Sequence, residues 1–545
     1  MQNSFKVSGQ IVDLISESVF PGTLYIEDGK IVSVVKEEVQ EQHFILPGLI
    51  DAHIHIESSM LTPAAFAHMA VVHGTVATVS DPHEIANVLG IEGVEFMIDN
   101  GKKVPFKFFF GAPSCVPATG FESSGAVLDS GAVESLLAKP EIPYLAEMMN
   151  YPGVLFHDSE VMAKLAAAKK FNKPVDGHAP GLMGEDAKNY IAAGITTDHE
   201  CFTMEEALEK IRYGMKIQIR EGSAAKNFDA LIDLLQDHPE SVLFCSDDKH
   251  PDDLACGHIN LLVKRAVAKG YDPLRVLKSC IVNPVEHYKI NIGLLQPGDD
   301  ADFIITNNLI DFQVLSTYIR GIKVAEDGKS LIKLPVAETP NKFNVEEVRP
   351  QDFCLADPGG KIRIIEAIEG QLITNTLIDS PKVSNGFLVS DTERDYLKIV
   401  VLNRYEASKP AIAFIKNIGL KQGALASTVA HDSHNIIATG ADDESIAQAI
   451  NLIISTKGGI AVVCGNESVL LPLPVAGLMS PADGNEVANS YEMANRLAKK
   501  AGTKLHAPFM TLSFMALLVI PQLKLSDKGL FDGSKFAFTS LATAE

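Results

Sequence analysis

Cysteine is scarce in this sequence, with seven residues among 545 and no Cys-x-x-Cys pair. An odd number of scattered cysteines argues against a disulfide framework, and the missing close pairs argue against a zinc site built from thiolates. We therefore expect a protein of the reducing cytoplasm.

Long hydrophobic runs and runs of basic residues are missing as well. The apolar stretch from Phe509 to Ile520 is too short to span a bilayer, and residues 1–16 lack the pattern of a signal peptide. Asp and Glu outnumber Lys and Arg by 69 to 47, and a net charge of −22 disfavours binding to a phosphate backbone. We expect a small-molecule substrate, no nucleic acid polymer and no membrane as partner.

The arrangement of apolar runs predicts an α/β fold with several domains. Between residues 47 and 285, eight strand-like runs alternate with amphipathic helical stretches, which is typical of a TIM-like (β/α)₈ barrel. Short strands are predicted in 1–46 and again in 286–345, and we expect these two segments to form a small flanking β-sandwich. A polar, proline-bearing stretch at 335–351 predicts a linker, and 346–545 predicts a separate mixed α/β C-terminal domain.

Polar residues at the ends of the predicted strands are the candidates for chemistry, because barrel enzymes carry their catalytic groups there. His53 and His55 end the first run and, two apart on a strand, point to the same side. This pair alone is a weak signal, since 16 histidines in 545 positions produce a His-x-His about half a time per chain by chance. Later strand ends supply Glu147, His178, His199 and Asp247.

Four imidazoles and two carboxylates are enough donors for two divalent ions. Nitrogen and oxygen donors suit Zn, Mn or Fe(II) better than metals that prefer thiolates. A carboxylate can bridge two ions about 3.5–4 Å apart. The sequence therefore predicts a two-metal site at the barrel mouth.

Several segments carry a family resemblance. The stretches LPGLIDAHIHIESS, PGDDADF and SDD resemble the amidohydrolase superfamily. Within it, the chain resembles the adenine deaminases over essentially its whole length, through GTVATVSDPHEIANVLG, AEMMNYPGV, HDSHN and IPQLKLSDKGLFD. The resemblance implies a ligand set for two ions: His53, His55 and Asp247 for one, His178 and His199 for the other, and Glu147 as the bridge.

Glu147 separates the subfamilies of this superfamily. Dihydroorotase and hydantoinase relatives place a carbamylated Lys in the bridging role, and no Lys occupies this strand end. Adenosine and cytosine deaminase relatives work with one metal and need no bridge.

The resemblance also implies a reaction: hydrolytic deamination of adenine to hypoxanthine and ammonia in purine salvage. A hydroxide activated by two Mn(II) or Fe(II) ions, or by Zn(II), would attack C6 of the purine. Asp247 would pass the water proton towards the departing ammonia, or it is a ligand only. Glu84 would protonate ring N1 and His83 would polarise the adduct, or both cap the following helix. We also expect a homo-oligomer, either a dimer or a tetramer.

Other polar residues have two interpretations each. Glu57 and Ser58, and likewise Arg220 and Glu221, either support the ligands or belong to ordinary loops. Asp248 points away from its neighbour on a regular strand and is predicted to form a salt bridge or to cap a loop. The segment 431–435, HDSHN, forms a lid contact or a further metal site, or it is a turn with solvated histidines.

Three rival functions are distinguishable. The other zinc deaminase fold needs H-x-E followed by P-C-x-x-C, and the second motif does not occur here. Another amidohydrolase acting on a cyclic amide or an N-acyl substrate is the nearest alternative, because ligands define the reaction centre but not the substrate. A non-catalytic barrel homologue is disfavoured by the intact ligand set.

Overall fold

The structure is a computed structural model that describes residues 4–223, 225–336 and 338–543. The chain forms two compact units, each built from several stretches of sequence. The first contains Met1–Pro82, Val94–Ser114 and Asp129–Ala337, and the second contains His83–Gly93, Cys115–Leu128 and Glu338–Glu545. Two short segments that we assigned to the barrel from the sequence thus belong to the second unit.

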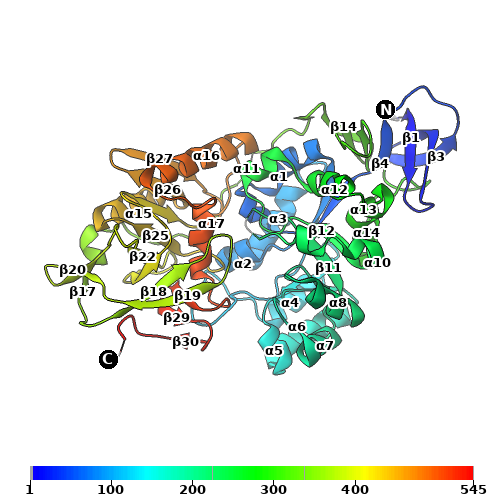
Figure 1. Cartoon of the computed structure of the whole chain (residues 1–545). Helices are drawn as coiled ribbons and strands as arrows, with labels where there is room; N and C mark the ends of the chain where they lie inside the picture. Colours follow the sequence, from blue (N-terminus) through cyan, green and yellow to red (C-terminus); the bar gives the residue numbers. More distant parts are fainter. Residues whose placement is uncertain (1–3, 224, 337, 544–545) are drawn as a thin grey trace. The chain divides into compact units, whose positions relative to one another are not determined.

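A mixed β-sheet in the first unit combines strands from both ends of that unit's sequence (Figure 1). Its order is β16-β15-β14-β13-β4-β1-β2-β3. The strands form one continuous hydrogen-bonded sheet, because β4 pairs with β1 on one side and with β13 on the other. The small β-sandwich expected from the sequence stays a prediction. The strands are β1 (Ser4–Asp13), β2 (Ser18–Glu27), β3 (Lys30–Lys36), β4 (Phe44–Pro47), β13 (Phe303–Thr306), β14 (Val314–Ile319), β15 (Ile322–Glu326) and β16 (Lys329–Ser330).

The turn between β2 and β3 shows how the local sequence sets this sheet. Asp28 and Gly29 have φ angles of 49° and 78°, in the left-handed region that a two-residue hairpin turn of type I′ requires. One face of the sheet buries Ile11, Leu24 and Phe303.

Eight short strands follow β4, and each lies within one of the eight apolar runs that the sequence predicts. Neighbours pair in parallel from β5 to β7, from β8 to β9 and from β10 to β12. Parallel bridges join Ala112 to Leu145 and Ile54 to Asp247, and Thr196 N donates to Val175 O at 2.9 Å. The strands are β5 (Leu49–Ile54), β6 (Thr75–Ser80), β7 (Lys107–Phe110), β8 (Leu145–Met148), β9 (Val175–Gly177), β10 (Thr197–Asp198), β11 (Lys216–Arg220) and β12 (Val242–Cys245).

Helices alternate with these strands, which confirms the predicted α/β architecture. Several begin at an acidic cap: the carboxylate of Asp158 accepts hydrogen bonds from the first amides of α6, and Asp272 does the same for α13. The longer helices are α1 (Pro63–Ala70), α3 (Ile91–Gly101), α4 (Ser130–Leu137), α6 (Ser159–Lys170), α7 (Gly184–Ala192), α8 (Met204–Arg212), α12 (Ile259–Ala268) and α13 (Pro273–Cys280). Shorter ones are η1 (Ile56–Ser59), η2 (Val71–His73), α5 (Tyr151–Leu155), α9 (Phe228–Leu231), α10 (Leu234–Asp237), η3 (Pro239–Ser241), α11 (Pro251–Cys256) and α14 (Val282–Tyr288).

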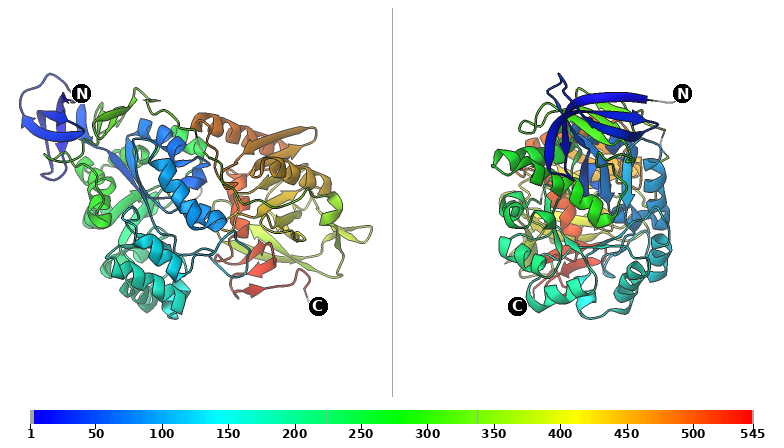
Figure 2. Two further views of the ribbon diagram at one scale, coloured as in Figure 1. Left: turned by 180° about the vertical axis from the view of Figure 1, so that it is seen from behind. Right: turned by 90° about the vertical axis from the view of Figure 1, so that its right-hand side faces the viewer.

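The second unit is built on its own eight-stranded sheet of order β19-β18-β23-β22-β25-β24-β26-β27. Helix α15 covers its core, where Ile446, Ile450 and Ile453 meet the buried side chains of the strands. Helix α16 packs against β26 and β27, as the orange ribbons in Figure 2 show. The strands are β18 (Ile362–Ala367), β19 (Thr374–Asp379), β22 (Leu397–Leu402), β23 (Ala411–Lys416), β24 (Ala424–Ser427), β25 (Ile436–Gly440), β26 (Gly459–Cys464) and β27 (Glu467–Pro472).

The remaining elements of the second unit are short, apart from two of its helices. Two three-stranded sheets are formed by β17 (Leu355–Ala356), β20 (Lys382–Ser384) and β21 (Phe387–Val389), and by β28 (Leu523–Ser526), β29 (Gly529–Asp532) and β30 (Ala537–Phe538). The helices are α2 (His83–Leu89), η4 (Pro350–Phe353), α15 (Asp443–Thr456), α16 (Gly484–Ala501), α17 (Pro508–Ser513) and η5 (Phe514–Ala516).

The stretch that the sequence predicts as a linker packs onto the second unit. Its described residues before η4 contain neither helix nor strand, yet Val348 is buried in the core beneath α15. Asn344 N donates to Arg404 O at 2.7 Å, and Val348 N donates to Asn451 Oδ1 at 2.9 Å. These hydrogen bonds and the burial of Val348 fix the stretch on the second unit, so it is not a free linker.

Two further observations bear on the composition. No helix within the described ranges is long and apolar enough to cross a membrane. All seven cysteines lie within the described ranges and none of them forms a disulfide; five of them are buried.

Candidate metal centre

The six predicted ligands come together in the first unit. His53 lies in β5 and Glu147 in β8, while the other four follow their strands within two residues: His55, His178, His199 and Asp247. His178 keeps 13% of its side chain exposed, and the other five side chains are almost completely buried. Parallel strands that end at the same edge bring together residues that are up to 194 positions apart.

One half of the cluster is formed by His53, His55 and Asp247. Asp247 Oδ1 lies 3.3 Å from His55 Nε2 and 3.8 Å from His53 Nε2. The main chain fixes this arrangement, since Asp247 N donates to His53 O at 2.9 Å. Asp247 has a φ of 56°, a conformation that is unusual outside glycine and that is often found at functional sites.

Glu147 connects the two halves. Its Oε1 lies 3.3 Å from His55 Nε2. Its Oε2 lies 2.9 Å from His178 Nδ1 and 3.4 Å from His199 Nε2. One carboxylate oxygen therefore faces each group of imidazoles, which is the arrangement that a bridging ligand needs.

Contacts behind the ligands orient the imidazole rings. His55 Nδ1 is 3.1 Å from Asp81 O, and His53 Nδ1 is 3.9 Å from Asp176 Oδ2. Asp176 in turn accepts a hydrogen bond from Tyr288 OH at 2.9 Å. Such contacts to the outer ring nitrogen leave the inner Nε2 directed at the cluster.

Sequence reasoning missed one important residue, Glu200, whose only signal was its place next to His199. The buried guanidinium of Arg220 donates to both Glu200 oxygens, at 2.5 Å and 2.8 Å, and its Nη1 also donates to Asp247 Oδ2. Glu200 Oε1 lies 3.6 Å from His178 Nδ1 and 3.4 Å from His199 Nε2. Of the two interpretations of Arg220, the structure favours support of the ligands over an ordinary loop.

The protonation of the cluster shows how its charges balance. Burial by itself would lower the pKa of His55, but hydrogen bonds to Asp247 and Glu147 hold it well above its ordinary value. Burial would lower that of His178 too, but the carboxylates of Glu200 and Glu147 raise its pKa to about 9. Burial would raise the pKa of Glu147, but His178 and His55 hold it well below its ordinary range.

This charge pattern fits divalent metal ions. Protons on the imidazoles offset the buried carboxylates, and a bound cation would take over that role while the protons leave. Candidate ligand atoms of His53, His55 and Asp247 lie within 4.8 Å of one another, as do those of His53, Glu147 and His199. The donors are imidazole nitrogen and carboxylate oxygen, which suit Mn, Fe and Zn.

Three of the four buried lysines in the described part of this unit have partners outside the cluster. Lys107 Nζ lies 2.6 Å from Asp302 Oδ2, Lys210 Nζ lies 2.6 Å from Asp198 Oδ2, and Lys164 Nζ donates to a main-chain carbonyl. These three lysines are therefore not placed between the two histidine groups, where the structure has Glu147.

The remaining polar candidates of the first unit lie around the cluster. Ser58 Oγ donates to Asp248 Oδ1 at 2.5 Å, so Asp248 anchors the turn after β5. Glu57 is buried in the same turn. Glu221 forms an ion pair with Arg265 at 2.9 Å.

His83 and Glu84 begin α2, in the second unit. His431 Nδ1 lies 3.2 Å from Glu84 Oε1, and His83 Nε2 lies 3.7 Å from Asp432 Oδ1. We refer to residues 431–434 as the 431–434 loop. Its four residues are buried, which contradicts a turn with solvated histidines.

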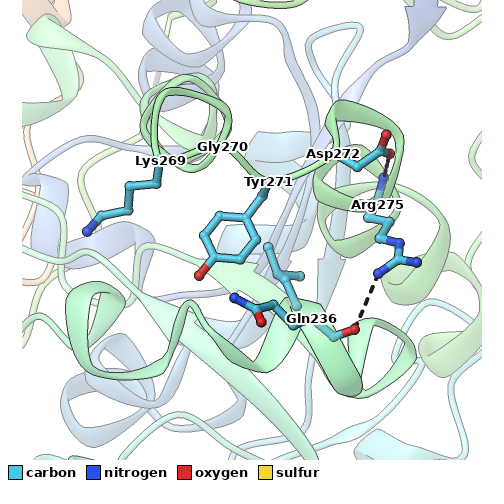
Figure 3. A pocket seen from close by; sticks show the side chains of 7 residues that line it. Gln236, Lys269, Gly270, Tyr271, Asp272 and Arg275 are labelled. Atoms are coloured by element: carbon cyan, nitrogen blue, oxygen red, sulfur yellow. Dashed lines mark hydrogen bonds between the residues drawn. The ribbon is translucent and has the colours of Figure 1, made fainter.

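A separate surface pocket of about 270 Å³ lies beside α10 and contains none of the predicted site residues (Figure 3). Its polar side chains are engaged locally: Arg275 donates to Gln236 O at 3.3 Å, and Tyr271 OH donates to Asp233. The lining residues are Leu235, Gln236, Lys269, Gly270, Tyr271, Asp272 and Arg275.

Comparison with known proteins identifies the family. The family model described as "Amidohydrolase family" matches residues 44–330. The model described as "Adenine deaminase C-terminal domain" matches residues 371–537. An adenine deaminase of Methanosarcina mazei is 54% identical over 99% of this chain and 100% of its own length. The chain belongs to the adenine deaminase family. Another relative of that name, from Salinibacter ruber, is 52% identical over 99% of both chains.

A solved D-hydantoinase structure is 15% identical with a TM-score of 0.45, covering 61% of this chain and 97% of that one. Family membership confirms the resemblance drawn from the sequence.

Proposed function

We propose that the protein hydrolyses adenine to hypoxanthine and ammonia, as an enzyme of purine salvage that uses two divalent metal ions. Full-length relatives named adenine deaminase support the substrate. The observation that carries the two-metal mechanism is the position of Glu147, with one oxygen towards His55 and the other towards His178 and His199.

The metal ligands in this proposal are those of the buried cluster. Two divalent ions held there would supply the acidity that makes a water molecule nucleophilic towards C6 at neutral pH. Mn(II) or Fe(II) fits the donor set, and Zn(II) is an alternative. The proposed ligands are His53, His55 and Asp247 for one ion, His178 and His199 for the other, and Glu147 for both.

Asp247 is the proposed proton carrier as well as a ligand. Burial would raise its pKa, but Arg220 and His55 hold it well below its ordinary range, so the carboxylate is ionised at neutral pH. Arg220 binds Oδ2 and leaves Oδ1 directed at the histidines. Transfer of the water proton towards the leaving ammonia contributes about 10²–10⁴-fold in rate for such groups.

Glu84 and His83 are proposed to act on the purine itself. Glu84 would protonate ring N1, and His83 would polarise the adduct. The sequence supports this role, because both residues follow β6 closely, as the proposed ligands end or follow their own strands.

We also propose that strands β5 to β12 close into a (β/α)₈ barrel. The parallel bridge between Ile54 and Asp247 supports closure, because it pairs the residues after the last strand with the first strand. The hydrogen bond from Thr196 N to Val175 O supports continuity between β9 and β10. In a closed barrel all six proposed ligands share one mouth.

Two predictions about context belong to the same proposal. Seven cysteines, none of them in a disulfide within the described ranges, support a reducing cytoplasm as the working environment. Assembly into a dimer or a tetramer stays a prediction that light scattering can test.

The decisive experiment is adenine turnover by the metal-loaded protein. The chain is purified with Mn(II) or Fe(II) supplied, bound metal is quantified, and conversion of adenine to hypoxanthine is followed by absorbance. Glu147→Gln keeps the size of the side chain but removes its charge. We expect about two metal ions per wild-type chain, and a loss of at least about 10²-fold in kcat/KM for the variant.

Glu141→Gln is a matched control, because Glu141 is an exposed carboxylate of the same unit. Its activity and metal content should equal those of the wild type. A metal-replete wild type that is inert on adenine but opens cyclic amides or cleaves N-acyl substrates would establish the alternative amidohydrolase function.

A further inference from the structure

Two histidine and carboxylate pairs connect the 431–434 loop to the start of α2. In one pair His431 contributes the imidazole and Glu84 the carboxylate, 3.2 Å apart. In the other the roles are exchanged, with His83 as the imidazole and Asp432 as the carboxylate, 3.7 Å apart. The loop thus offers one partner of matching chemistry to each of the two residues.

The loop is held in place by its own unit. It connects β24 to β25, two strands of the central sheet. Tyr405 OH donates to Ser433 O at 2.6 Å, and the ring of His431 stacks on Phe514 with centroids 4.9 Å apart. Because the loop is buried and anchored at several points, it can fix the side chains that it contacts.

We propose that the 431–434 loop is a positioning device for Glu84 and His83, in which His431 sets the Glu84 carboxyl and Asp432 sets the His83 imidazole. The proposal rests on the proposed function, because Glu84 must act on the purine for its position to matter. It also assigns a role to the C-terminal domain that characterises this family: without the loop, the two residues lose their fixed orientation.

A metal site is the competing use of these residues. Candidate ligand atoms of Glu84, His431 and His434 lie within 4.8 Å of one another. However, His434 Nδ1 accepts a hydrogen bond from Ala430 N at 3.3 Å, which places the proton of the neutral ring on Nε2. A cation at Nε2 would have to displace this proton while Nδ1 stays bound to the main chain, so the structure favours positioning.

The first test separates positioning from folding by kinetics. His431→Ala should lower kcat about 10–100-fold, as loss of a partner behind a functional group typically does, with KM within about threefold. His431→Gln, whose amide can still donate to Glu84, should recover part of the loss. His506→Asn, at an exposed histidine of the same unit, should have wild-type kcat and KM.

The second test asks whether His431 acts through Glu84. Combined with Glu84→Gln, His431→Ala should change kcat by less than about threefold, because the group that it orients is already lost. Full additivity of the two losses would overturn the proposal. So would wild-type kcat in His431→Ala.

The third test does not depend on activity. In the full-length protein with ¹⁵N-labelled histidine, Glu84→Gln should lower the pKa of His431, and Asp432→Asn should lower that of His83. Unchanged titration curves would refute the two pairs even if adenine is the substrate. A third equivalent of bound Mn(II) that disappears in His434→Ala would replace positioning by a metal site. If the wild type fails to deaminate adenine while these pKa changes are found, the proposed function fails and the pairing stands.

Discussion

Arg220→Met should destabilise the metal-free protein by about 3–5 kcal/mol. Arg220 is 2% exposed, and its guanidinium is shared between Glu200 and Asp247, two carboxylates that are also buried. Removing one member of a buried ion pair leaves an uncompensated charge, which typically costs about 3–5 kcal/mol. Two carboxylates lose their partner here, so the upper part of that range is expected.

Arg265→Met is the matched control. Arg265 forms ion pairs with Glu221 and Asp229, but 38% of its side chain is exposed. Exposed pairs contribute about 0–1 kcal/mol because water and salt screen them. The two variants remove the same residue type from the same unit and differ mainly in burial.

The assay is urea unfolding of chelator-treated protein followed by far-UV circular dichroism, which suits a chain without tryptophan. The shift in midpoint multiplied by the slope m gives the change in the free energy of unfolding. Adding Glu200→Gln to Arg220→Met should recover part of the loss, since one unpaired charge is removed. A change below about 1 kcal/mol for Arg220→Met, equal to that of Arg265→Met, would refute the reasoning.

Three further predictions follow from the same structure. The raised pKa of His178, about 9 in the metal-free protein, means that a proton must leave before its nitrogen can bind a metal. Metal affinity should therefore rise with pH and level off above about 9, which chelator competition between pH 6 and pH 9.5 can measure; an affinity that does not vary with pH would contradict this. Asp247→Asn should lower kcat about 10²–10⁴-fold even at saturating Mn(II), whereas full recovery by excess Mn(II) would identify Asp247 as a ligand only. Burial lowers the pKa of Lys524 from its ordinary value of 10.5 to about 7. Between these two pH values Lys524 is therefore protonated in the unfolded chain but not in the folded protein. The stability of the second unit should rise with pH across this window in thermal melts, and Lys524→Met should abolish that rise; identical pH dependence in both proteins would argue against it.

The strand positions depend on local sequence and could be predicted from it. The eight strands lie within the predicted runs because alternation of apolar runs with helical stretches is a property of neighbouring residues. Because barrel enzymes carry their catalytic groups at the ends of the strands, polar residues there, such as His178 and Asp247, could be selected without any knowledge of contacts. Their convergence in the structure agrees with that selection, while their role as ligands stays a prediction. The family follows from the whole sequence.

Contacts between distant segments could not be predicted in this way. Apart from its place next to His199, Glu200 resembles many other carboxylates of the sequence until the fold brings Arg220 beside it. The predicted linker is buried because Val348 meets a core assembled from strands about 50–115 residues later in the chain. The hydrophobic periodicity of a segment predicts whether it forms a helix or a strand, but it does not predict which distant residues the segment contacts.

By itself, therefore, the sequence determined the α/β class, the positions of the strands, the family and the candidate ligands, because each depends on local patterns or on similarity along the chain. Only the tertiary structure decided that Glu147 faces both groups of histidines, that Arg220 ties Glu200 to Asp247, and that the 431–434 loop meets Glu84. Those features depend on side-chain directions across strands and loops, and such directions are set by packing between residues far apart in the chain.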